Sequence, residues 1–125
     1  MKAAHRVSRT VFMILAWGLA LCILVQTLIA GLAIFTHASY WASHRIFVHI
    51  FGYLPILMLV FAFACRLPHS LRWHCVGLYA LIYVQYFTAN FPNAGALHPV
   101  IALLLFWHSL VVAQHAAKNL RHEGT

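Results

Sequence analysis

Residues 11–35 read VFMILAWGLALCILVQTLIAGLAIF, a predominantly apolar run without a single charged side chain. A helix needs about 20 apolar residues to cross a hydrocarbon core of roughly 30 Å, so this run is long enough to span a membrane. A basic tail precedes it, as in a secretory signal, but the run is roughly twice as long as the apolar region of such a signal. We therefore interpret it as an uncleaved anchor and as the first membrane span.

Three further apolar runs follow, at about residues 45–65, 73–91 and 96–116, and the first of these three starts at Ser43 or Arg45. The segments between them are a polar and aromatic stretch, a stretch with proline and arginine, and a turn cluster rich in Asn, Pro and Gly. Such short connections favour antiparallel neighbours. The sequence thus predicts one all-α domain over residues 1–125, an integral membrane four-helix bundle with up-down-up-down topology.

Composition and charge exclude several classes of protein. Hydrophobic residues make up 64% of the 125 residues and charged residues only 7%, which no soluble domain matches. The formal net charge of +7 does not indicate nucleic-acid binding, because the basic residues flank apolar spans. Seven of the eight Lys and Arg residues fall on one predicted side, and only Arg45 falls on the other. We expect a lipid bilayer as the partner, in the bacterial inner membrane, with both termini in the cytoplasm.

Each predicted span carries one strongly polar side chain in its outer half. Gln26, His49, Gln85 and His98 lie within roughly 13 Å of the outer ends of their spans, at a rise of about 1.5 Å per residue. Amide and imidazole groups in lipid need hydrogen-bond partners, so these four side chains should point inward and meet in a common layer.

The main functional hypothesis is a haem b held by His49 and His98 as axial ligands. Imidazole is a common axial ligand of haem iron, and transmembrane bundles hold cofactors between facing helices. Gly52 clears space beside His49, Tyr53 adds a phenol, and Ala102 is a small residue one turn from His98. The chain would then be an electron-transfer module. Its single acid, Glu123, excludes paired carboxylates for hydrolysis, so any enzymatic activity would be redox chemistry.

Two alternatives use the same polar layer without haem. In the first, the histidines and glutamines only hold the helices in register, and the chain is an accessory subunit of a larger membrane complex or forms a homo-oligomer. In the second, Gln26, Gln85, Tyr53 and the histidines bind the polar head of a quinone or lipid.

Other histidines are weaker candidates for metal binding. His37 and His44 lie in or near the first outer loop, where they could form a copper or zinc site with His49 or His98. In the inner half, His108 and His115 share a helix face and could bind a second haem together with His74.

A set of short motifs resembles an uncharacterised family of small four-helix bacterial membrane proteins. The motifs are Gln26-x-x-x-Ala30-Gly31, His49-x-x-Gly52-Tyr53, Arg66-Leu67-Pro68, Gln85 and Ala96-Leu97-His98-Pro99-Val100, within about residues 24–112. The resemblance implies four spans and these polar positions, but no established activity. In the family pattern an Arg often follows the second-span histidine and an Asn often follows the valine. Here Ile50 and Ile101 take those places, which removes polar contacts there.

Overall fold

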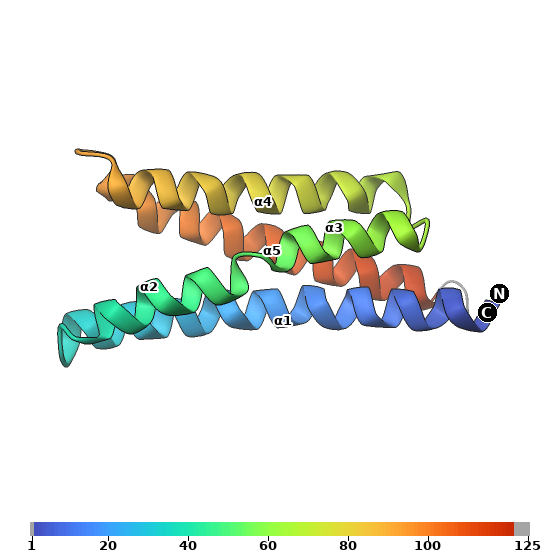
Figure 1. Cartoon of the computed structure of the whole chain (residues 1–125), viewed down its shortest axis with the longest axis horizontal. Coiled ribbons are helices and arrows are strands. Elements are labelled where there is room, and N and C mark those ends of the chain that lie inside the picture. The colour runs from blue at the N-terminus through green and yellow to red at the C-terminus, as the bar shows by residue number, and fades with distance from the viewer. Residues whose placement is uncertain (1, 122–125) are drawn as a thin grey trace.

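The computed structural model describes residues 2–121, all of whose regular secondary structure is helical (Figure 1). Glu123, the single acid, lies outside the described residues. The helices are α1 (Lys2–Phe35), α2 (Tyr40–Phe51), α3 (Leu54–Ala64), α4 (His69–Asn90), the 3-10 helix η1 (Gly95–Leu97) and α5 (His98–Arg121). Because α2 and α3 continue one another along the bundle, the architecture is the predicted antiparallel four-helix bundle.

Three of the predicted spans are confirmed as long and apolar enough to cross a membrane: Ala4–Phe35, Tyr40–Ala64 and Gly95–Leu120. They make the chain a multi-pass membrane protein. Helix α4 is not among these three, because polar side chains along its whole length, such as His74, Gln85 and Asn90, lower its mean hydropathy. It nevertheless runs along the length of the bundle and packs against α3 and α5 (Figure 1).

The second predicted span is broken in its middle, which the sequence interpretation had as one continuous helix. Helix α2 ends at Phe51 and α3 begins at Leu54, with Pro55 in the first turn of α3. Proline has no backbone N–H, and its ring clashes with the carbonyl four residues earlier, so the regular helix cannot pass this point. Gly52 and Tyr53 remain close to helical dihedral angles, which makes the break a hinge rather than a loop.

The turn between α3 and α4 follows the Schellman pattern of helix termination. The Leu67 N–H donates to the Ala62 carbonyl at 2.9 Å, and the Arg66 N–H donates to the Phe63 carbonyl at 3.1 Å. Arg66 takes the left-handed position of this motif with φ 50°, where glycine is usual. Leu67 is 2% exposed, so the turn is fastened to the core.

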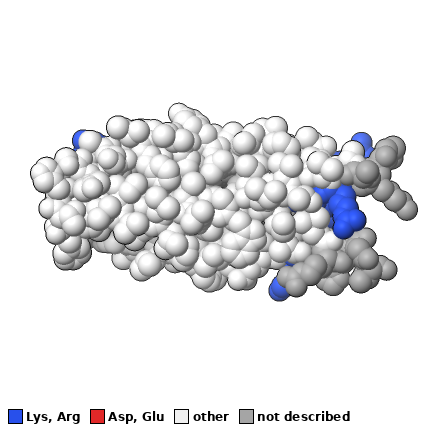
Figure 2. All heavy atoms as spheres, turned by 90° about the horizontal axis from the view of Figure 1, so that it is seen from below, with Lys and Arg blue, Asp and Glu red and all other residues white. Residues whose placement is uncertain are grey.

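The packed core lies between the middle of the bundle and the end where α1 begins and α5 ends; we call this part the inner half. Its largest fully buried side chains are those of Phe12, Leu19, Pro55, Met58, Leu71, Cys75, Leu78, Ser109 and Val112. The other end, where α1 meets α2 and α4 meets α5, is the outer half (Figure 1). Lys and Arg side chains gather at the inner end, and the middle of the visible face carries no charge (Figure 2).

Candidate functional site

Gln26 and His44 join α1 to α2 through a reciprocal pair of hydrogen bonds. The Gln26 side-chain Nε2 donates to the His44 carbonyl at 2.8 Å, and the His44 Nδ1 lies 3.2 Å from the Gln26 carbonyl. A carbonyl oxygen only accepts, so His44 Nδ1 must carry the proton of the neutral ring. This tautomer leaves a lone pair on Nε2.

His98, at the start of α5, is anchored in the same way to α4. Its Nδ1 lies 3.2 Å from the Gln85 carbonyl and 3.2 Å from the Thr88 hydroxyl. With its amide oriented by its partners, the Gln85 side chain donates to the His98 carbonyl at 2.9 Å and to His98 Nδ1 at 3.1 Å, and it accepts from the Ala102 N–H at 3.1 Å. The first turn of α5 is therefore fixed to α4, and no hydrogen bond among the described residues involves His98 Nε2.

The two anchored imidazoles face each other across the outer half. The ring centres of His44 and His98 lie 6.4 Å apart with an angle of 59° between the rings, and the Trp41 ring meets His44 edge-on at 5.5 Å. The buried Oε1 of Gln26 has no hydrogen-bond partner among the described residues. The structure thus joins Gln26, Gln85 and His98 in one layer, with His44 in the place where we expected His49.

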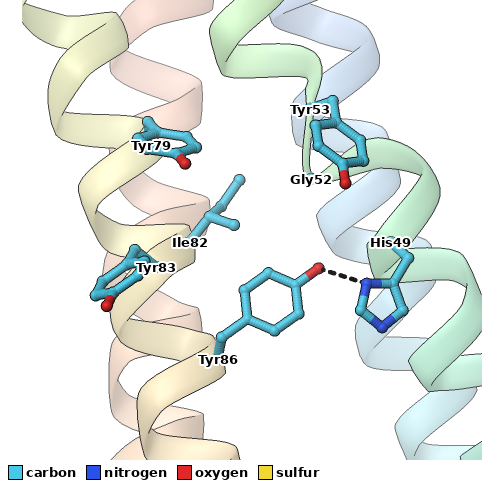
Figure 3. Close-up of a pocket in the computed structure, with 7 residues that line it drawn as sticks. All are labelled: His49, Gly52, Tyr53, Tyr79, Ile82, Tyr83 and Tyr86. Atoms are coloured by element: carbon cyan, nitrogen blue, oxygen red, sulfur yellow. Dashed lines mark hydrogen bonds between the residues drawn. The ribbon is translucent and has the colours of Figure 1, made fainter.

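His49 instead lies against Tyr86 at a separate groove beside the helix break. Its Nδ1 is 3.2 Å from the Tyr86 hydroxyl, and the two rings stack with centres 5.5 Å apart. The groove has a volume of about 190 Å³ and lies between the α2–α3 hinge and α4 (Figure 3). Its lining residues are His49, Gly52, Tyr53, Tyr79, Ile82, Tyr83 and Tyr86. The ligation of one haem by His49 and His98 is not tested by these contacts and stays a prediction.

The weaker metal candidates form local contacts. The His74 ring lies 5.1 Å from that of His108 and 5.7 Å from that of His115, and His108 Nε2 is 3.3 Å from the His74 carbonyl. His37 Nδ1 faces Ser39 in its own loop at 2.7 Å. Within residues 2–121, no group of three or more His, Cys, Asp or Glu side chains is arranged to hold a metal ion.

Several site residues escaped the sequence interpretation. Thr88 contacts His98, and Tyr79 and Tyr83 line the groove together with Tyr86, which the sequence already suggested as a neighbour of the site. A signal existed for the tyrosines, because positions 79, 83 and 86 recur at helical spacing and so share one face of α4. His44, five residues before His49, was predicted only as a weaker metal-binding candidate with His49 or His98, because no sequence pattern distinguished it from its neighbours.

Residues 26–91 match a family of unknown function, DUF6220, and this match covers more than half of the chain. It includes Gln26, His44, His49 and Gln85 but stops before the Ala96–Val100 run. No match was found among curated proteins or among solved structures. The chain therefore belongs to DUF6220.

Proposed function

We propose that this protein is a small b-type haem protein of the bacterial cytoplasmic membrane that transfers electrons. The observation that carries the proposal is the pair of imidazoles on α2 and α5, His44 and His98. The Nδ1 of each lies 3.2 Å from a backbone carbonyl, and none of the hydrogen bonds among the described residues uses its Nε2. Metal-ligating histidines typically donate their second nitrogen in this way, because that hydrogen bond fixes the tautomer and the ring orientation.

The separation of the two rings supports axial ligation of one iron atom. Two metal–nitrogen bonds of about 2 Å, with roughly 1 Å more from each nitrogen to its ring centre, place two axial imidazoles about 6 Å apart. The ring centres of His44 and His98 are 6.4 Å apart. The haem would supply one-electron chemistry, and the protein would supply the ligands, their orientation and an apolar surrounding.

Room for a macrocycle needs a movement of α2 that opens space around the two rings and keeps their separation. Helix α2 packs along α1 and makes few contacts with α4 or α5, whereas α3 packs against α1 and α4. The hinge at Gly52 and Tyr53 separates the movement of α2 from the packed α3. The same movement would carry His49, so His49 is the second candidate for the α2 ligand.

The distribution of basic residues supports the orientation in the membrane. Seven of the eight Lys and Arg residues belong to the start of α1, the end of α5, the α3–α4 turn or the first residues of α4, at the inner end. Arg45 on α2 belongs to the outer half. Because cytoplasmic segments carry the excess of Lys and Arg, the inner end would face the cytoplasm.

The test is the spectrum of the protein purified in mild detergent after expression with added haem. We expect a Soret band, and sharpened visible bands after reduction with dithionite. His98→Ala should abolish the low-spin spectrum, because α4 and α5 carry no other histidine in the described outer half. His108→Ala, a matched histidine on the same helix in the inner half, should leave it unchanged.

His44→Ala and His49→Ala identify the ligand on α2. We expect His44→Ala to abolish the low-spin spectrum and His49→Ala to weaken it at most. The reverse result would assign the ligand to His49 and restore the pair predicted from the sequence. A colourless, iron-free protein after haem supplementation would overturn the proposal.

A further inference from the structure

We infer that the groove beside the α2–α3 hinge binds the ring of an isoprenoid quinone, a flat ring with two opposite carbonyl groups and an apolar tail. The inference rests on the groove and its tyrosines, not on the layer of His44 and His98. It can therefore be tested independently of the haem proposal.

The size of the groove fits one substituted six-membered ring. Its volume is about 190 Å³. An apolar cavity of roughly 150 Å³ is large enough to bind benzene, whereas pockets for larger ligands reach about 300–1,000 Å³. The groove is thus too small for a haem and suited to a single ring whose tail lies outside it.

Three of the four tyrosine hydroxyls that line the groove have no hydrogen-bond acceptor among the described residues. Within residues 2–121, the hydroxyls of Tyr53, Tyr79 and Tyr83 have no hydrogen-bond partner, and Tyr86 has only His49. Tyr53 is 68% exposed and Tyr83 is 67% exposed, so these phenols face the surrounding lipid. A hydroxyl without a partner is costly in hydrocarbon. An occupant that carries acceptors would relieve this cost, and a quinone carries two.

Donors stand on both walls of the groove. Tyr79 and Tyr86 extend from α4, while His49 and Tyr53 extend from the opposite wall, on either side of the hinge (Figure 3). Gly52 lies between them: a Cβ added there would lie 2.7 Å from the Val48 carbonyl oxygen and 3.4 Å from the Tyr86 hydroxyl, so a side chain at this position would crowd the hinge and Tyr86. The bare backbone thus lets Tyr86 approach the hinge, and donors on the two walls can reach the two opposite carbonyls of a ring in the groove.

The charge and depth of the groove argue against a phospholipid headgroup. No Lys or Arg is among the described residues that line it, so a phosphate would find no cationic partner. Gly52 follows the 12 residues of α2, which places it about 18 Å below the outer end of that helix, near the middle of a bilayer. An apolar isoprenoid tail is stable at this depth, whereas a charged headgroup there would be costly.

The experiment is calorimetric titration of the detergent-purified protein with a decyl-substituted dimethoxy-methyl-benzoquinone at constant detergent concentration. We expect saturable binding of one equivalent. Tyr86→Phe and Tyr53→Phe should each weaken it about fivefold, the equivalent of one neutral hydrogen bond. Tyr40→Phe, a matched change at the start of α2 outside the groove, should bind like the unmodified protein. Decylbenzene, which lacks the carbonyls, should show no saturable binding.

Equal affinities of all three tyrosine variants, or equal binding of decylbenzene, would overturn the inference and leave a groove for any apolar chain. Gel filtration confirms that each variant is folded, and Tyr53→Phe provides the test if Tyr86→Phe is not. The same titration with His98→Ala separates this inference from the haem proposal. Quinone binding should persist there, and its loss would place the quinone in the imidazole layer instead of the groove.

Discussion

The inner and outer halves of this bundle are built on different principles. In the inner half, α1, α3, α4 and α5 meet through apolar side chains such as Phe12, Met58, Leu78 and Val112, each less than 2% exposed. In the outer half, α2 is tied to α1 by the Gln26–His44 hydrogen bonds, and α5 is tied to α4 through His98. Close packing holds one half together, and polar contacts hold the other.

The difference indicates that the inner half contributes most of the stability, whereas the outer half carries the candidate functional site. In lipid, helices associate mainly through close packing, because the bilayer is as apolar as a leucine side chain. The inner half meets that requirement. The outer half, with imidazoles and a hinge beside a groove, is less tightly packed and is therefore the half that can adapt to a ligand.

The largest expected effect is a difference in stability between the same substitution at the two ends of α1. Phe12→Ala in the inner half should destabilise the bundle by about 3 kcal/mol, because it opens a cavity in a close-packed core. Phe35→Ala, the same change at an 87% exposed position at the outer end of α1, should alter stability by less than about 0.5 kcal/mol. Unfolding in detergent mixtures followed by circular dichroism measures both. Equal losses would mean that the two halves are packed alike.

An intermediate effect is expected at the junction of the two halves. Pro55→Ala restores a backbone N–H and removes the ring clash, which costs a helix interior up to about 3 kcal/mol. Since the buried proline ring also contributes packing, we expect a net stabilisation of about 1 kcal/mol. Spin labels at the exposed positions Ile46 and Leu103 should then report a narrower distribution of distances between α2 and α5. An unchanged distribution would show that Pro55 does not control α2.

The smallest effect concerns two glycines that share the same helical state. Gly18→Ala, where a Cβ would meet nothing within 4 Å, should raise stability by up to about 1 kcal/mol. At Gly77 a Cβ would lie 3.2 Å from His108 Nε2, which is hydrogen-bonded to the His74 carbonyl. Gly77→Ala should therefore not raise stability, so the free energies of unfolding of the two variants should differ by about 1 kcal/mol. Unfolding followed by circular dichroism measures both variants. Equal gains in stability would mean that the His108 ring moves aside without cost.

Much of the fold could be predicted from the sequence because a membrane span is a strong signal. Long apolar runs without charge allow few structures other than helices, and their connections here are too short for anything but antiparallel neighbours. The break at Pro55 was missed because hydropathy does not register it. Gly52 and Pro55, three residues apart within one apolar run, were the available signal.

The site was harder to predict because it depends on the rotation and tilt of α2. Depths counted from helix ends place His49 in the layer, but His44 is the residue found there. The two differ by five residues, which is about 140° around the helix axis and roughly 7.5 Å along it. No local pattern decides which of them faces α5, because the hinge and the contact with Gln26 set the rotation of α2.

The hinge also divides the second span between the two leaflets of the bilayer. Helix α2 has 12 residues and α3 has 11, so each is about 17 Å long and covers roughly one half of the hydrocarbon thickness. Lipids that thicken or crowd the leaflet around α2 would therefore act on α2 before they act on α3. The imidazole layer would then respond mainly to the composition of that leaflet.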